Sequence, residues 1–240
     1  MKLQNIQKNW EGLAETDPMW SILTQKEMVN RQWDTVDFFS TGEVEVNNWF
    51  SNFEELKHLN YGRALDFGCG MGRITQGLCA HFDYVLGVDI SGTMVDLANE
   101  NNIFSEKCFY MHNDQPNLKD LESDSFDFIS SYITLQHLPK EYIFSYIEEF
   151  LRVLKPGGVI LFSLPTRPPF LYRFLIRIFT QSFVNNLRRL RYKMKYVMEM
   201  HWVSEAEMKN FIECRGKLIN MYPNSAVGED WQEYLFLVSK

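Results

Sequence analysis

Short apolar runs alternate with amphipathic segments over the middle of the chain, from about residue 62 to residue 165. Five of the runs have the length and continuous hydrophobicity of strands buried on both faces, at 63–68, 84–90, 107–114, 126–133 and 159–165. Segments with helical periodicity lie between them, at 73–82, 91–102 and 139–158. Strands that alternate with helices in this way predict a parallel sheet covered by helices on both faces.

The segments on either side of this alternation have different patterns. Residues 1–60 are rich in aromatic side chains and are predicted to be helical, with a break at 40–42, where the sequence is Ser-Thr-Gly. The alternation stops after Pro165 and resumes about 35 residues later with a helix at 204–215 and two strands, near 217–223 and at 233–240. Because no crossover helix separates these last two strands, we expect an antiparallel finish to the sheet.

Together these elements predict an α/β fold with a doubly wound, mostly parallel, seven-stranded sheet of Rossmann-like architecture. We expect four regions in this order: an N-terminal helical cap (1–60), the ligand-binding core (61–165), a basic helical insertion after the fifth strand (166–200), and a C-terminal helix with the last two strands of the core (201–240).

The chain has 240 residues and a formal net charge of −7, and its hydrophobic content of 45% is that of an ordinary globular protein. The first twenty residues lack the apolar core of a signal peptide, and no apolar run has the length needed to span a bilayer. The four cysteines form neither a closely spaced pair nor a zinc-binding pattern. These features predict a cytoplasmic protein with reduced thiols and no metal site.

Charge is distributed unevenly along the chain. Residues 166–200 contain eight basic residues and one acid, Glu199, whereas the rest of the chain is strongly acidic. Three roles are open for this segment. We favour packing on the acidic remainder as a lid over binding of an anionic small molecule, such as a sugar or a glycan-linked metabolite, and we place contact with a membrane surface last. The acidic chain, with a pI of about 5.3, argues against a nucleic-acid partner. No pattern indicates an oligomeric state.

Three glycines, Gly68, Gly70 and Gly72, follow the first expected strand at alternate positions. A strand that enters such a turn and then a helix places backbone N–H groups beside an open crevice. The dinucleotide fingerprint requires a small residue where this chain has Arg73, so a nicotinamide-dependent oxidoreductase is disfavoured. We expect Arg73 to face solvent at the helix start or to pair with an acid.

The pattern that does fit is an acid two residues before the first glycine, as in "DFGCGMG" from Asp66 to Gly72. Here the chain resembles the class I S-adenosylmethionine-dependent methyltransferases. The resemblance covers about residues 62–164 and has four further landmarks: "GVDIS" (87–91), "ND" (113–114), "SFDFISSYITLQHL" (125–138) and "LRVLKPGGVILFS" (151–163). It implies the methyltransferase form of the fold and S-adenosylmethionine as cofactor.

The resemblance also implies which part of the glycine loop contacts the cofactor. The backbone at Gly68 and Gly70 would approach the methionine part, with the small side chain of Cys69 between them. Asp66 would fix this loop and the ammonium group of the cofactor. The alternative for Asp66 is that it only organises the turn, and a nucleophilic role for Cys69 has no support from nearby residues.

The nucleoside would lie at the ends of the second and third strands. Asp89 would accept hydrogen bonds from the ribose diol, Ile90 and Met94 would line the adenine, and Asp114 would accept from the adenine amino group beside the Gln115 backbone.

Each of these roles has an alternative. Asp89 can instead cap the helix that starts at Ser91, Met94 can belong to the core, and Asn113 can replace Asp114.

S-Adenosylmethionine supplies its own leaving group, so the protein contributes positioning and, for a hydroxyl acceptor, a general base. His137 follows the fourth strand and is the candidate base, and a packing or capping role is its alternative. Ser131 and Tyr132 lie at the same edge, and we expect them to contact the cofactor or the substrate, with Ser131 on the cofactor side. We expect methyl transfer to an oxygen or nitrogen of a small-molecule acceptor. The rival is a cofactor-binding scaffold without turnover, against which the intact acids Asp66 and Asp89 argue.

Overall fold

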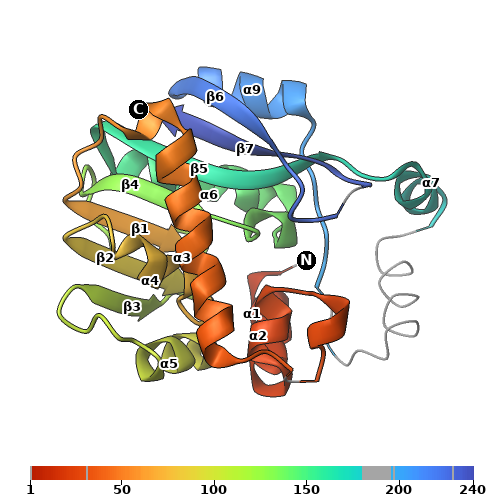
Figure 1. Ribbon diagram of the computed structural model, residues 1–240. Coiled ribbons are helices and arrows are strands. Elements are labelled where there is room, and N and C mark those ends of the chain that lie inside the picture. The colour runs from red at the N-terminus through yellow and green to blue at the C-terminus, as the bar shows by residue number, and fades with distance from the viewer. Residues whose placement is uncertain (1, 31, 180–195, 197, 229) are drawn as a thin grey trace.

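A computed structural model describes residues 2–30, 32–179, 196, 198–228 and 230–240, which form a sheet with helices around it (Figure 1). The strands are β1 (Arg63–Phe67), β2 (Tyr84–Asp89), β3 (Cys108–His112), β4 (Phe126–Ser131), β5 (Leu154–Arg167), β6 (Lys217–Asn224) and β7 (Gln232–Ser239). The α-helices are α1 (Leu3–Thr16), α2 (Pro18–Ile22), α3 (Thr35–Asn52), α4 (Arg73–Leu78), α5 (Gly92–Glu100), α6 (Lys140–Val153), α7 (Phe170–Ile178) and α9 (Glu205–Glu213). Short 3₁₀ helices are η1 (Lys26–Met28), η2 (Glu54–Leu56) and η3 (Leu135–His137).

The seven strands form one sheet in the order β3-β2-β1-β4-β5-β7-β6. Strands β1 to β5 are parallel, and β7 runs antiparallel to both β5 and β6. This confirms the mostly parallel, doubly wound sheet with an antiparallel finish. The order reverses between β1 and β4, so a crevice is expected outside the carboxyl ends of these two strands.

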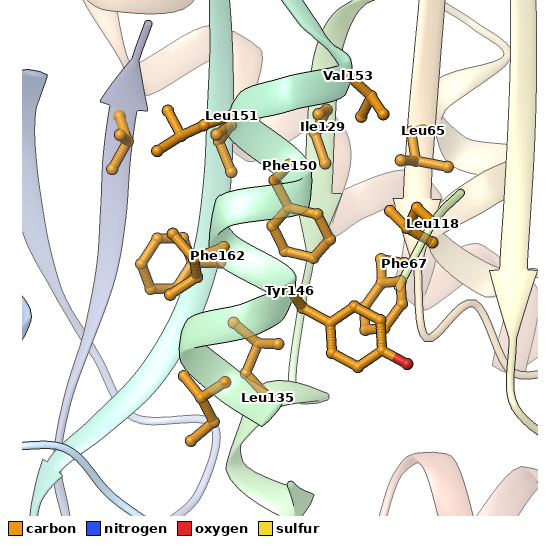
Figure 2. Close-up of a cluster of buried hydrophobic side chains, with 14 of the residues drawn as sticks. Leu65, Phe67, Leu118, Ile129, Leu135, Tyr146, Phe150, Leu151, Val153 and Phe162 are labelled. Atoms are coloured by element: carbon orange, nitrogen blue, oxygen red, sulfur yellow. The ribbon is translucent and has the colours of Figure 1, made fainter. Parts of the chain in front are cut away.

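Alternate residues of the strands pack into two hydrophobic layers, one on each face of the sheet. On β1, Leu65 and Phe67 face the layer that contains α6 and α9, whereas Ala64 faces the layer that contains α3 and α4. Figure 2 shows the first layer, in which Phe67 contacts Tyr146 and Phe150 with ring centroids 4.4 and 5.1 Å apart. The carboxyl end of β1 is therefore packed against α6.

The long helix α3 crosses the sheet and continues through residues 40–42, so the expected break there is wrong. Gly42 is needed for packing and does not end the helix. A Cβ at this position would lie 2.1 Å from the carbonyl oxygen of Arg73, which means that α3 lies directly against the start of α4.

The boundary between α6 and β5 also differs from the predicted one. The helix ends at Val153 and the strand begins at Leu154, whereas Pro156 and a turn at Gly157–Gly158 were expected to end the helix. Proline disfavours helical backbone at the residue before it, so the helix ends ahead of Pro156, and the strand continues through Gly157, whose φ is +82°.

Helix α7 is the helix of the basic insertion that the structure describes, and it stands away from the sheet in Figure 1. None of its residues is buried; Phe170 is 75% and Phe174 50% exposed, and Arg173 and Arg177 are exposed beside them. Arg167 ends β5, and the five basic residues from Arg188 to Lys195 lie outside the described residues. Among the helices that the structure describes, none combines the length and the apolar character needed to cross a membrane.

Candidate active site

The loop between β1 and α4 brings bare backbone to the carboxyl edge of the sheet. Gly68 and Gly70 have φ values of +76° and +52°, in the left-handed region that favours glycine. A Cβ on Gly68 would lie 2.1 Å from Cγ2 of Thr134, and a Cβ on Gly70 would lie 2.6 Å from Cδ1 of Ile22. The Gly68 N–H donates to the Val88 carbonyl at the end of β2 (2.7 Å). The loop is thus enclosed between α2 and the segment after β4.

Asp89, the last residue of β2, holds this loop from the side. Its Oδ2 accepts a 2.8 Å hydrogen bond from the Gly70 N–H, and its Oδ1 accepts one of 2.8 Å from the Ser91 N–H. Burial raises the pKa of the Asp89 carboxyl, and these two amides oppose that effect. Each carboxylate oxygen has a second lone pair, so the group can hold the helix start and also accept from two ligand hydroxyls.

Glu11 of α1 is a residue of this region that no motif indicated. Its Oε1 accepts a 2.6 Å hydrogen bond from the Gly92 N–H, and its Oε2 accepts from the Ser91 hydroxyl (3.0 Å) and the Thr93 N–H (3.2 Å). Burial alone would raise the pKa of the Glu11 carboxyl, but the hydrogen bonds at the start of α5 outweigh it and lower the pKa. The carboxylate therefore ties the N-terminal helix to the element that follows Asp89.

Asp66 lies beneath the glycine loop and is buried. Its Oδ2 accepts from the Thr75 hydroxyl (2.7 Å) and its Oδ1 from the Ser130 hydroxyl (2.8 Å). Burial raises the pKa of the Asp66 carboxyl to about 6, although the two hydroxyls and the nearby charge of Arg73 act in the opposite direction. Asp66 does not line the cavity described next, so its position fits the loop-organising role more closely than direct contact with an ammonium group.

A cavity that is partly open to solvent lies against the glycine loop. Seven residues that were expected to contact a ligand line it: Gly68, Gly70, Asp89, Ile90, Met94, Tyr132 and His137. The other lining residues are Ile6, Trp10, Ser21, Ile22, Phe67, Arg73, Val88, Asn113, Ile133, Thr134, Leu138 and Tyr146. Helices α1 and α2 therefore supply part of the cavity wall. The only feature of the sequence that pointed to this was the aromatic-rich composition of the N-terminal segment.

The adenine end of the predicted site differs in detail from the expectation. Asn113 is buried and lines the cavity, whereas Asp114 and Gln115 are exposed and do not line it. The side-chain amide of Gln115 donates to Asp114, and the Gln115 carbonyl accepts from the Tyr146 hydroxyl (2.6 Å). The placement favours Asn113, the alternative left open for this position.

Two further predicted residues are buried behind the cavity wall. Burial raises the pKa of the Cys69 thiol well above its ordinary value, which leaves it without nucleophilic character at neutral pH. Ser131 is fully buried, and its hydroxyl has no hydrogen-bond partner among the described residues. Neither side chain lines the cavity.

Arg73, in contrast, is inside the molecule, so the expectation that it faces solvent or pairs with an acid is wrong. Arg73 lines the cavity and is only 4% exposed. Nη1 donates to the Thr41 hydroxyl (3.3 Å), and among the described residues Arg73 forms no ion pair. The physical reason is the close approach of α3 at Gly42, which covers the start of α4.

His137 ends η3 and lines the same cavity. Its Nδ1 lies 2.7 Å from the Glu199 carbonyl oxygen, and its ring packs edge-on against Trp10 with centroids 5.1 Å apart. Because a carbonyl oxygen only accepts, Nδ1 carries the hydrogen in the neutral ring and the lone pair lies on Nε2. The packing role and the role of a base are therefore compatible in this geometry.

Comparison with known proteins places this site in a family context. Residues 65–162 match the family model described as a methyltransferase domain. The demethylmenaquinone methyltransferase of Staphylococcus haemolyticus is 29% identical over 152 residues, 58% of this chain and 62% of the relative. That of Staphylococcus aureus (strain JH9) is 29% identical over 178 residues, 69% of this chain and 71% of the relative. The chain thus spans less than two thirds of the first relative and somewhat more of the second.

Solved structures extend the likeness to the whole fold. Magnesium protoporphyrin IX methyltransferase from Synechocystis PCC 6803, crystallised with bound SAH, has a TM-score of 0.66 and 14% identity, covering 99% of both chains. A protein from Pyrococcus horikoshii OT3 has a TM-score of 0.63 and 16% identity, covering 91% of this chain and 98% of its own. At these identities the likeness concerns the fold alone.

Proposed function

Because the chain belongs to the class I S-adenosylmethionine-dependent methyltransferases, we propose that it transfers a methyl group to an oxygen or nitrogen of a small-molecule acceptor. The observation that carries this proposal is the single cavity that collects the glycine loop, Asp89 and His137. The residues proposed to bind the cofactor nucleoside and the imidazole of His137 thus line the same cavity.

The residues at this site fit the cofactor of the family. Asp89 keeps lone pairs for a ribose diol, and Gly68 and Gly70 present backbone without side chains at the cavity wall. Ile90 and Met94 offer apolar contacts to an adenine ring. When bound, S-adenosylmethionine supplies an electrophilic methyl group and its own leaving group.

The cavity also supports a small acceptor with an apolar part. Ile6, Trp10 and Ile22 from the N-terminal helices contribute apolar side chains to the wall. The acceptors named for the relatives, demethylmenaquinone and magnesium protoporphyrin IX, are small molecules. These two classes, together with anionic sugars, form the first panel of acceptors to test.

His137 is proposed to take the proton that a hydroxyl or ammonium acceptor loses. Nδ1 lies 2.7 Å from the Glu199 carbonyl oxygen, which orients the ring and places the lone pair on Nε2, 3.5 Å from the side-chain nitrogen of Gln136. The packing of Trp10 against the ring restricts its rotation. An acceptor that arrives neutral as an amine needs only the positioning.

The test combines a binding and a turnover measurement. Calorimetry with S-adenosylhomocysteine is expected to show a single site, and the acceptor panel is expected to include a compound that releases S-adenosylhomocysteine from S-adenosylmethionine. Asp89→Ala serves as the variant that should lose binding, and Asp96→Ala, an exposed acid on α5, serves as its matched control. Absence of nucleoside binding to the wild-type protein would overturn the proposal.

A further inference from the structure

The buried guanidinium of Arg73 lacks a counter-ion within the part of the chain that the structure describes. It is 4% exposed, and its one hydrogen bond is the 3.3 Å contact from Nη1 to the Thr41 hydroxyl. Thr41 in turn donates to the Phe38 carbonyl (2.6 Å), so it can hold the arginine but cannot neutralise it. The Nε–H of Arg73 is buried and has no partner among the residues that the structure describes.

This arrangement is costly for the protein alone. A guanidinium stays charged at all physiological pH values, and burying it without a partner costs several kcal/mol in general. Two carboxylates lie in its surroundings, but each already accepts other hydrogen bonds: Asp66 from Thr75 and Ser130, and Glu45 from the indole of Trp49. Neither carboxylate forms an ion pair with Arg73 among the described residues, so the Nε–H of the guanidinium is left for an acceptor that is not part of the described chain.

Arg73 also belongs to the wall of the cavity, where a ligand would bind. Arg73 lines the cavity together with Gly70 and Tyr132, while α3 shields it from bulk solvent on its other side. The shielding follows from Gly42, whose lack of a side chain lets α3 lie against the start of α4. A planar guanidinium in such a site matches the geometry of a carboxylate, which it can bind through two parallel hydrogen bonds.

We propose that Arg73 is an anion-recognition residue that binds a carboxylate of a ligand in this cavity. Two ligands can supply the carboxylate: the aminoacyl part of the cofactor or a carboxylated acceptor. The inference rests on the proposed function only in taking the cavity as the place of methyl transfer. It assigns to the glycine-loop helix a charge-recognition role that its sequence position did not indicate.

The first experiment separates the carboxylate from the rest of the cofactor. Calorimetry compares S-adenosylhomocysteine with its decarboxylated analogue, which keeps the amine, on wild-type protein, Arg73→Gln and Arg73→Lys. Arg73→Gln is expected to lower the affinity for S-adenosylhomocysteine by about tenfold or more and to leave the affinity for the analogue unchanged. Arg73→Lys keeps the positive charge but cannot form two parallel hydrogen bonds, so its affinity for S-adenosylhomocysteine is expected to lie between those of the wild type and Arg73→Gln. Arg215→Gln, an exposed arginine paired with Glu148, is the control.

The second experiment addresses the acceptor as the source. Benzoate, a simple carboxylate probe, is added to the S-adenosylhomocysteine-loaded proteins and the shift of Tm is measured. If the carboxylate belongs to the acceptor, the affinity for S-adenosylhomocysteine is unchanged in Arg73→Gln, and benzoate raises the Tm of the wild type but not of the variant. Equal loss of both nucleosides in both variants, or no difference in either experiment, would overturn the inference.

Failure of the two proposals is distinguishable. If wild-type protein does not bind S-adenosylhomocysteine, the proposed function fails. The role of Arg73 can then still be tested by the increase in Tm that benzoate causes in the unloaded wild type and in Arg73→Gln. If Arg73→Gln does not fold, the contrast between the two nucleosides on Arg73→Lys decides the question, because a purely structural arginine would not discriminate between them.

Discussion

The carboxylate of Glu11 accepts a 2.6 Å hydrogen bond from the backbone N–H of Gly92, a residue 81 positions later in the chain. The bond joins α1 to the first turn of α5, immediately after Asp89. Ile6 and Trp10 of the same helix α1 line the cavity, so one contact couples the N-terminal wall of the site to the strand end that carries the acid. In this molecule the N-terminal helix is part of the site.

Removal of the Glu11 charge is expected to weaken both stability and binding. Glu11→Gln should lower the free energy of unfolding by about 1–2 kcal/mol, because an anion at a helix start satisfies free N–H groups and the helix dipole. It should also weaken S-adenosylhomocysteine binding, since α1 and the start of α5 lose their connection. Urea denaturation and calorimetry measure the two effects. Glu43→Gln, an exposed acid on α3, is the control, and equal behaviour of the two variants would contradict the prediction.

Asp66 makes stability depend on pH in the direction opposite to that of a typical surface acid. Its pKa is about 6 in the folded protein and about 4 in an unfolded chain, so the folded state binds the proton more tightly. The stabilisation is therefore complete below pH 4 and is lost as pH rises through 6. We expect the wild type to lose about 1–2 kcal/mol relative to Asp66→Asn between pH 5 and pH 8.

The measurement is urea denaturation of both proteins at several pH values. Asparagine is a suitable replacement because the hydroxyls of Thr75 and Ser130 can donate to its oxygen and accept from its amide. Other titrating groups are common to both proteins and cancel in the difference. A difference that is constant with pH would show that Asp66 does not titrate in this range.

Asp89 is expected to contribute to cofactor affinity through the ribose. Asp89→Asn should weaken S-adenosylhomocysteine binding by about 10- to 100-fold, because charged hydrogen bonds are the stronger class. The 2′-deoxy analogue, which lacks one hydroxyl, should lose less affinity on the same substitution. Calorimetry gives both affinities. The Tm of each protein shows whether loss of the hydrogen bonds from Gly70 and Ser91 to Asp89 has destabilised the fold. Equal losses for the two ligands would show that the carboxylate acts only on the loop.

Much of this fold and part of the site could be predicted because they depend on local sequence. Buried parallel strands require continuous apolar runs, and the close approach of backbone at Gly68 and Gly70 requires glycine, so both leave a direct trace in the sequence. Asp89 follows from its place at a strand end. The sheet order and the glycine loop therefore match what the sequence predicts.

The remainder depends on contacts between distant segments, which no local pattern encodes. Arg73 is buried because Gly42, about thirty residues earlier, lets α3 lie against it, and the same glycine was mistaken for a helix break. Glu11 reaches the start of α5 from another helix, and the partner of His137 is a backbone carbonyl at Glu199. In each case the role is set by tertiary packing.

His137 can be tested by a substitution that keeps its structural contact and removes only its basicity. The side-chain amide of His137→Asn can still donate to the Glu199 carbonyl, as Nδ1–H does at 2.7 Å, but it has no basic nitrogen. With an acceptor that must lose a proton, kcat is expected to fall about 10²- to 10⁴-fold, the usual contribution of a general base, while the Kd for S-adenosylhomocysteine changes little. Steady-state kinetics and calorimetry measure these two quantities. Trp10→Leu, which removes the ring contact but not the base, should have a smaller effect on kcat. Comparable losses of cofactor affinity and kcat in His137→Asn would instead identify the imidazole as packing for the cavity wall.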